Sequence, residues 1–243
     1  MMWGAAISVL AVTVSATPQV SFPLNAQVPP VAHVGESFNF QFASTTFEPN
    51  FATLQYSLTG NPSWLSLDGA IRTLRGTPSA SDVGSLTFTI IAAGAAGAVA
   101  NMQATLVVVE PGGPTASGNV SKQLLTAGKL SGPSSLTLLP STGFDFKFST
   151  DTFTGNGKNL SYYATLSDHT PLPSWVAFNS ESLKFSGSTP QVGASPQSFE
   201  ILLIASDILG FAGAWIAFTL VVSQHTFIFS PWKQTINTPK VLR

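Results

Sequence analysis

An internal repeat of about 110 residues limits what this chain of 243 residues can fold into more than any other feature of its sequence. Several segments of the first half return in the same order in the second half. The matching pairs are 38–42 (FNFQF) with 144–148 (FDFKF), 62–65 (PSWL) with 173–176 (PSWV), 74–78 (LRGTP) with 185–190 (FSGSTP), Phe88 with Phe199, and 105–108 with 219–222 (both TLVV). Because the order is kept, the sequence predicts two successive domains with one fold.

Each repeat has the residue pattern of β-strands. In residues 38–42 and 144–148, phenylalanines alternate with polar residues, which places the rings on one face of a strand and the polar side chains on the other. Residues 86–90 (LTFTI) alternate in the same way, and clusters of Gly, Pro, Asn and Ser separate the short runs. The sequence therefore predicts an all-β protein of two tandem immunoglobulin-like β-sandwich domains, each with its own core.

The segments around the repeats predict the domain boundaries. Residues 3–14 form an uninterrupted apolar run, and Val14-Ser15-Ala16 is a small-residue cleavage pattern, so we interpret the start as a secretory signal peptide. The alternative is a buried N-terminal strand. The predicted parts are a signal peptide at 1–16, a first repeat at 17–110, a Pro/Gly-rich linker at 111–118, a second repeat at 119–224, and a tail at 225–243 that resembles the start of a truncated third module.

One segment of the second repeat has the apolar character of a membrane span. Residues 201–222 (ILLIASDILGFAGAWIAFTLVV) are long enough to cross a bilayer, but Asp207 near the middle would cost about 3 kcal/mol there. The equivalent segment of the first repeat carries Asn101 and Gln103 and would not span. We therefore predict two strands joined by a turn at residues 207–210, and a membrane anchor that this chain does not contain.

Composition excludes several classes of function. Charged residues make up only 9% of the chain, the net charge is −1, and Lys and Arg form no basic run, so we predict no nucleic-acid partner. The absence of cysteine excludes a disulfide framework, thiolate metal sites and a cysteine nucleophile. In an exported chain, the sequons at Asn119 and Asn159 are predicted glycosylation sites.

No catalytic motif is present. The three histidines, His33, His169 and His225, lie in no metal-binding or hydrolase motif, so we predict that the protein is not an enzyme. We interpret His169, in the loop-like segment 167–171 (SDHTP), as a solvated side chain. A catalytic role would require His169 and a carboxylate to meet in a cleft.

The order G-x-x-F-x-F, T-F, P-S-W, G-T-P, V-G and L-V-V resembles dystroglycan-type cadherin-like repeats. Two such repeats behind a signal peptide resemble, more particularly, the axial-budding-pattern cell-surface proteins of fungi, over roughly residues 20–223. The resemblance implies a cadherin-like sandwich, a place at the extracellular side of the plasma membrane or in the wall, and calcium binding. It also implies a recognition or adhesion role whose partner is another cell-surface or wall protein, or a glycan.

Few carboxylates are available for the implied calcium site. Ca²⁺ takes about six to eight oxygen ligands, and the linker offers only Glu110 and Asn119 in place of the cadherin D-x-N-D-N segment. Residues 205–210 (ASDILG) resemble the cadherin A-x-D-x-x-G loop, so Asp207 is a predicted metal ligand, with Asp151 as a second donor. The alternative is that Asp207 caps a turn and Asp151 is a solvated loop residue.

Trp64 and Trp175 hold equivalent positions and separate two interpretations of function. Equivalent aromatic residues in an alternating pattern are typical of a core, which favours a non-enzymatic recognition or adhesion ectodomain. If they are exposed, they form a binding platform, which favours the alternative of a secreted carbohydrate-binding or cell-wall structural protein. Gly76 and Gly187, each followed closely by proline, are interpreted as turn residues.

Overall fold

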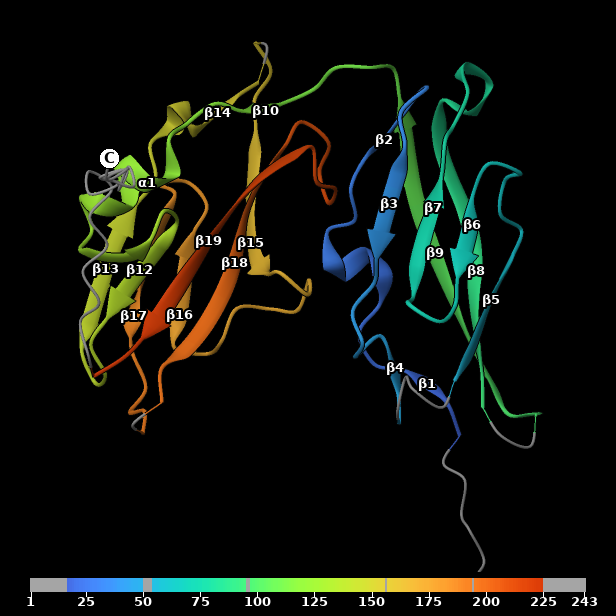
Figure 1. Ribbon diagram of the computed structural model, residues 1–243. Coiled ribbons are helices and arrows are strands. Elements are labelled where there is room, and N and C mark those ends of the chain that lie inside the picture. The colour runs from blue at the N-terminus through green and yellow to red at the C-terminus, as the bar shows by residue number, and fades with distance from the viewer. Residues whose placement is uncertain (1–16, 50–53, 95–96, 156, 194, 225–243) are drawn as a thin grey trace, which may run out of the picture.

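The computed structural model describes residues 17–49, 54–94, 97–155, 157–193 and 195–224. The predicted signal peptide and tail lie outside these residues. Strands dominate the described chain and form two sandwiches that lie next to each other, with the segment after β9 crossing from one to the other at one end (Figure 1). The predicted all-β fold of two tandem sandwiches is confirmed.

The first repeat packs a four-stranded sheet against a three-stranded one. The larger sheet has the order β2-β9-β8-β5, in which β2 runs parallel to β9, and the smaller has the antiparallel order β3-β7-β6; β1 pairs with β4. The strands are β1 (Gln19–Val20), β2 (Ala32–His33), β3 (Phe38–Gln41), β4 (Phe47–Glu48), β5 (Gln55–Thr59), β6 (Ser66–Asp68), β7 (Thr73–Gly76), β8 (Gly84–Ala93) and β9 (Val99–Val109).

The second repeat has the same strand order with one addition. Its sheets are β11-β12-β19-β18-β15 and β13-β17-β16, and β10 pairs with β14, so β12 takes the place of β2 and β11 extends the edge. Its elements are β10 (Thr115–Ala116), α1 (Val120–Leu125), β11 (Lys129–Gly132), β12 (Ser135–Leu138), β13 (Gly143–Lys147), β14 (Phe153–Thr154), β15 (Ser161–Leu166), β16 (Val176–Asn179), β17 (Lys184–Ser188), β18 (Gln197–Ser206) and β19 (Ala214–Val222). Strand β10 lies within the segment predicted as linker.

Each sandwich has its own core, built from the alternating residues. In the segment 38–42 all three phenylalanines are buried, while the residues between them are exposed. In the segment 144–148 two rings are buried, and Phe144 is half-buried at the margin of the core. Burial of one such ring contributes about 2–3 kcal/mol, so these faces supply much of the stability of each repeat.

The apolar segment 201–222 forms a hairpin, as predicted. Strands β18 and β19 pair continuously from Gln197 opposite Val222 to Ala205 opposite Ala214. Among the described residues, no helix is long and apolar enough to span a bilayer. The pairing also corrects one match of the repeat: Leu86 pairs with Leu106 as Phe199 pairs with Leu220, so Leu86, not Phe88, corresponds to Phe199.

The interpretation of Gly76 and Gly187 as turn residues was wrong. Both lie in strands, at the end of β7 and within β17. A Cβ atom on Gly76 would lie 1.8 Å from the carbonyl oxygen of Trp64, and one on Gly187 would lie 1.9 Å from that of Trp175. Each glycine therefore allows its strand to approach the backbone of the tryptophan in the same repeat, a close approach that any side chain would block.

A buried glutamine ties the start of the first repeat to the turn before β4. Gln27 ends a 3-10 helix at Leu24–Gln27 and is fully buried. Its Nε2 donates to Oγ1 of Thr46 at 2.8 Å, and its Oε1 accepts from the backbone N–H of Ala43 at 2.7 Å. Because both ends of the amide have partners, its burial does not leave a polar group unsatisfied.

The second repeat has an equivalent glutamine that the sequence analysis did not single out. Gln123, in α1, accepts with Oε1 from the backbone N–H of Ser149 at 2.6 Å and from Oγ1 of Thr152 at 3.1 Å. Gln123 is only half-buried. The two glutamines bond to matching positions of the two turns, although the helices that carry them differ in type.

Candidate functional site between the two repeats

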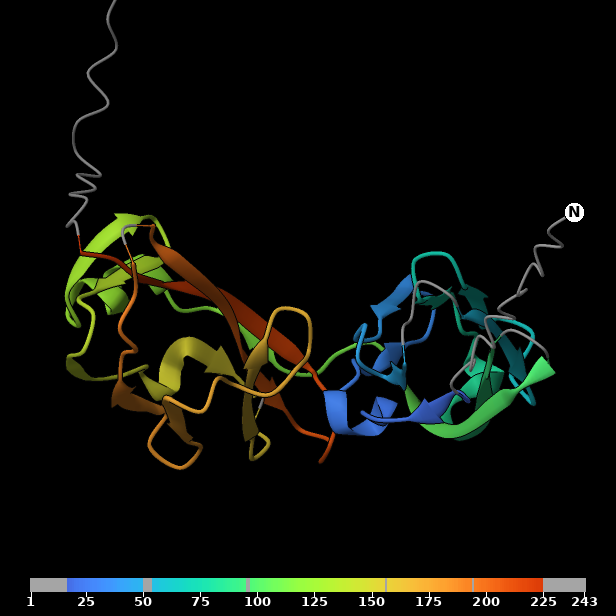
Figure 2. The ribbon, with the colours of Figure 1, turned by 90° about the horizontal axis from the view of Figure 1, so that it is seen from below.

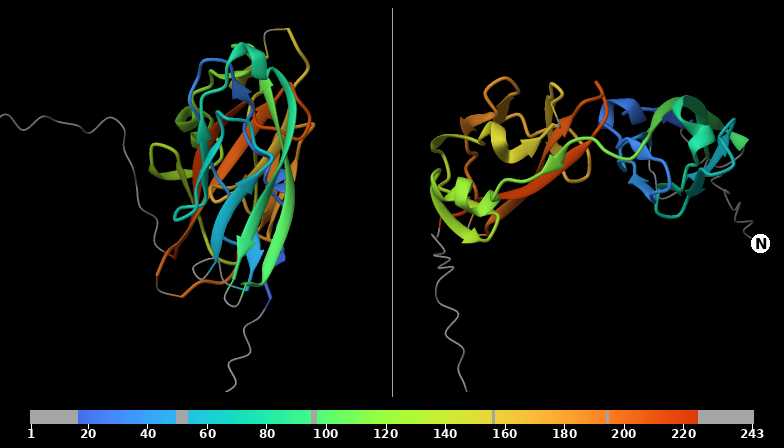
Figure 3. Two further views of the ribbon diagram at one scale, coloured as in Figure 1. Left: turned by 90° about the vertical axis from the view of Figure 1, so that its right-hand side faces the viewer. Right: turned by 90° about the horizontal axis from the view of Figure 1, so that it is seen from above.

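Backbone hydrogen bonds join the two sandwiches in addition to the covalent linker. The N–H of Val31 donates to the carbonyl of Ala212 at 2.9 Å, and the N–H of Ala212 donates to that of Pro29 at 2.9 Å. The loop between β18 and β19, which carries Ala212, reaches toward the first sandwich in Figure 2 and Figure 3. Leu202 and Ile204, on the face of β18 that lies toward this contact, are buried with Ala212. The repeats therefore meet in a defined contact.

His169 belongs to this contact, so its interpretation as a solvated loop residue was wrong. Its ring centroid lies 4.8 Å from that of Phe40 in the first repeat. Its Nδ1 is buried and has no hydrogen-bond partner among the described residues. Burial lowers the pKa of His169 below its usual value of 6.5, against the opposing effect of the neighbouring Asp168 carboxylate. The uncharged imidazole is thus the form that fits this contact.

Asp207, a predicted metal ligand, lies where the linker passes the second repeat. It lines a hollow together with Glu110 and His33. Its Oδ2 lies 2.5 Å from Nζ of Lys158, and its side chain is only 7% exposed, against 65% for that of Lys158. The lysine thus neutralises the carboxylate and occupies one of its oxygens, so a cation at this position would have to displace it.

Asp151, the other predicted ligand, is exposed in a 3-10 turn at Thr150–Thr152. It lines a different hollow, beside Lys122 and Lys147. The structure therefore does not bring Asp151 and Asp207 into one hollow. Across the described ranges, no three His, Asp or Glu side chains gather closely enough to hold a metal ion.

Both predicted glycosylation sites are accessible. Asn119 and Asn159 are exposed. Oδ1 of Asn119 accepts a hydrogen bond from the N–H of Lys122 at 2.9 Å and so caps α1. The amide nitrogen, which is the atom that would carry a glycan, is not used by this cap.

Trp64 and Trp175 form the margins of the two cores. Each is half-buried and packs against its core cluster. Trp64 meets the ring of Phe38 edge to face at 5.9 Å, and Trp175 meets that of Phe144 in the same way at 5.9 Å. These paired contacts support the core interpretation and leave neither indole as an exposed platform.

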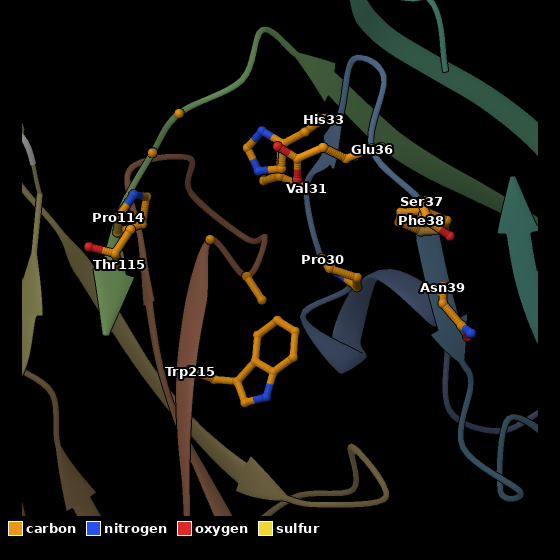
Figure 4. A pocket seen from close by; sticks show the side chains of 15 residues that line it. Pro30, Val31, His33, Glu36, Ser37, Phe38, Asn39, Pro114, Thr115 and Trp215 are labelled. Carbon is orange, nitrogen blue, oxygen red and sulfur yellow. The ribbon is translucent and has the colours of Figure 1, made fainter. Parts of the chain in front are cut away.

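Trp215 is an exposed tryptophan that the sequence analysis did not single out. It lies on β19 with 52% of its surface exposed, and it lines a hollow of about 520 Å³ between the two sandwiches. The opposite wall comes from the first repeat, through Pro30, the turn at His33 and Glu36, and Asn39 of β3 (Figure 4). Its position at a contact between domains, and not a sequence pattern, makes this tryptophan a candidate.

Comparison with known proteins identifies the repeats. The family model described as "Putative Ig domain" matches residues 11–109 and 126–223. The chain belongs to this Ig-like domain family. Both members of the pair in this chain are Ig-like sandwiches, which agrees with the strand order seen in each repeat.

One curated relative supports the resemblance to axial-budding-pattern proteins. The Ig-like pair is 35% identical over 237 residues to Axial budding pattern protein 2 of Saccharomyces cerevisiae, and the match covers 91% of this chain. The chain spans only 29% of the length of that relative. The dystroglycan-type label of the repeats stays a prediction.

Solved structures with similar folds are distant. The N-terminal two-domain Ig module of the Drosophila receptor protein tyrosine phosphatase DLAR gives a TM-score of 0.36 at 14% identity, covering 86% of this chain and 96% of that one. An endo-fucoidan hydrolase from glycoside hydrolase family 107 gives 0.32 at 18% identity, covering 81% of this chain and 27% of that one. TM-scores this low carry no functional information.

Proposed function

We propose that this chain is part of the extracellular portion of a non-enzymatic cell-surface protein and that it recognises another surface protein through its paired Ig-like sandwiches. The observation that carries the proposal is the match of both repeats to an Ig-like family, joined to the 35% identity with Axial budding pattern protein 2. The resemblance of the repeats to the axial-budding-pattern cell-surface proteins of fungi supports the proposed location.

The contact between the repeats supports a recognition role. The hydrogen bonds of Ala212 with Val31 and Pro29, and the ring contact of Phe40 with His169, hold two sandwiches in one arrangement. A partner that binds across both repeats then loses less conformational entropy on binding than it would with two loosely tethered domains. Polar Ser and Thr side chains, and not charges, cover much of the surface, which suits contact with a neutral partner surface.

The test is staining of intact cells with the full chain presented as a tetramer, because multivalency makes weak surface contacts measurable. With soluble neutral saccharides added to block any sugar contact, we expect staining that is lost when the cells are first treated with protease and kept when they are treated with glycosidases. A control tetramer of an unrelated Ig-like pair sets the background. Staining equal to this background, or staining that protease does not affect, contradicts the proposal of a protein partner.

Export and glycosylation are part of the same proposal. When the full chain is expressed in a secreting host, we expect it in the medium with a mass that falls after deglycosylation. Ser121→Ala and Ser161→Ala each remove one sequon and should each remove one glycan, at Asn119 and Asn159 respectively. An intracellular product, or an unchanged mass in both variants, contradicts this part of the proposal.

Calcium binding by Asp207 and Asp151 remains a proposal drawn from the family resemblance. The ion pair of Asp207 with Lys158 gives this proposal a definite test, because a calcium ion at Asp207 must displace the ammonium group of Lys158. The test is calorimetric calcium titration of the full chain, with Asp207→Ala and Asp151→Ala as controls and Lys158→Met as the variant expected to bind more tightly. No heat above buffer, in the wild type and in Lys158→Met, removes calcium from the function.

A further inference from the structure

The hollow between the sandwiches has the size and composition of a small-ligand site. Its volume of about 520 Å³ lies within the usual range for such sites, and its walls come from both repeats and from the linker. Trp215 presents its indole to the opening from one side, with Asn39 on the other side and Pro30 between them (Figure 4). No single sandwich contains this site, so it exists only when the two repeats are in contact.

The fold does not require a tryptophan at this position. The two TLVV segments align Leu220 with Leu106, so Trp215 corresponds to Asn101 of β9 in the first repeat. Asn101 is exposed, and the strand order around it is the same. A half-exposed indole in place of a polar residue costs solubility without adding to the core, which points to a role in binding.

Hydrogen-bonding groups around the indole are available to a ligand. The side chains of Glu36, Ser37 and Asn39 are exposed, and within the described part of the chain none of them has a hydrogen-bond partner. The Nε1–H of Trp215 is likewise without one. These groups include donors and acceptors in roughly equal measure, and no Lys or Arg lines the hollow.

We infer that this hollow binds a neutral saccharide, with a pyranose ring lying on the indole of Trp215 and its hydroxyls bonded to Asn39 and Ser37. A flat aromatic face suits the C–H face of a sugar ring, and the mixed donors and acceptors suit hydroxyl groups, which do both. Glu36, with no cation among the lining residues, disfavours anionic sugars and other anions. The inference concerns a site separate from the protein-recognition surface proposed above and does not depend on it.

The experiment is titration of the full chain with neutral trisaccharides of glucose, mannose and N-acetylglucosamine, followed by ligand-observed NMR and by tryptophan fluorescence. We expect at least one of the three to bind, and a disaccharide of heparin not to bind. Trp215→Ala should weaken binding by about tenfold or more, and Trp215→Phe by less, because the phenyl ring keeps part of the stacking surface. Asn39→Ala should weaken it as well.

Two control variants separate the site from a general effect on the surface. Asn101→Ala changes the matching position of the first repeat, and Leu209→Ala removes another exposed apolar side chain, which is 80% exposed and does not line this hollow. Both should bind as the wild type does. The inference is overturned if no trisaccharide binds at about 10 mM, if Trp215→Ala binds unchanged, or if a proline-rich peptide competes for Trp215 while the sugars do not. Loss of cell staining without loss of sugar binding would contradict only the proposed protein recognition.

Discussion

The two repeats agree in the residues that maintain the fold and differ in those that face the contact between them. Both have the same strand order, a glycine that allows close approach to a tryptophan carbonyl, and a glutamine that holds the turn before the short fourth strand. At the end of β18 the second repeat has Asp207, where the corresponding position of the first is Gly94. On the last strand it has Trp215 where the first has Asn101. The residues that both repeats share thus maintain the fold. The residues in which they differ, Asp207 and Trp215, lie near the contact between the two repeats.

The largest expected effect concerns the duplicated glycines. Gly76→Ala and Gly187→Ala each place a Cβ within 2 Å of a tryptophan carbonyl oxygen, and each should destabilise its own repeat by about 3 kcal/mol or more. The measurement is thermal unfolding followed by calorimetry. Gly193→Ala, which meets no atom within 4 Å, is the control and should change little. If one of the first two variants is as stable as the control, the repeats do not share this constraint.

The glutamines should differ in importance because they differ in burial. Gln27→Ala leaves the N–H of Ala43 and the hydroxyl of Thr46 unsatisfied in the interior, so we expect a loss of about 2 kcal/mol in the first repeat. Gln123→Ala leaves the N–H of the exposed Ser149 free to bind water and only the hydroxyl of the buried Thr152 without this partner, so it should cost about 1 kcal/mol. Urea unfolding measures the free energy of unfolding of both variants. Equal losses of stability would show that burial does not decide how much each glutamine contributes.

Removal of Asp207 tests the first divergent residue. Asp207→Asn removes the ion pair with Lys158 and should lower the stability of the second repeat by about 1 kcal/mol, since one partner is largely exposed. Because salt screens such a pair, the difference from the wild type should shrink at high ionic strength. The control is Asp145→Asn, whose carboxylate pairs with Lys184 and is 67% exposed, so that the change should be smaller. A larger loss of stability in Asp145→Asn than in Asp207→Asn would contradict the stabilising role of the pair between Asp207 and Lys158.

The smallest expected effect is a pH dependence of the contact. Burial lowers the pKa of His169 in the folded state, so the contact is fully present above pH 6.5 and weakens as the pH falls below that value toward the lowered pKa, because the unfolded chain then binds more protons. Small-angle scattering and amide exchange of Val31 and Ala212, whose N–H groups bond across the contact, measure it. His169→Phe, which keeps the ring against Phe40, should remove the pH dependence. A wild-type contact that does not change between pH 7.5 and about pH 5 would disprove it.

Much of each sandwich could be predicted, because alternation and repetition are local properties of the sequence. The buried phenylalanines of 38–42, the hairpin of 201–222 and the core positions of Trp64 and Trp175 all follow from which residues alternate. The glycines were misread because proline follows each of them closely, while their actual constraint is a carbonyl more than ten residues earlier in the chain. The glutamines gave no signal, since a single Gln belongs to no periodic pattern or motif.

The sequence by itself determined that this protein has two similar all-β domains with aromatic cores, because strand periodicity and repetition can be read without knowing where any residue lies. Only the tertiary structure decided which side chains meet at and near the contact between the two domains. The half-buried ring of His169 packs against Phe40, Asp207 is paired with Lys158, and Trp215 lines a hollow whose opposite wall comes from the other repeat. Each of these relations joins residues far apart in the chain. The packing of one sandwich on the other brings His169 to Phe40 and forms the hollow at Trp215, while two loops of the second sandwich bring Lys158 to Asp207. No local pattern in the sequence encodes either arrangement.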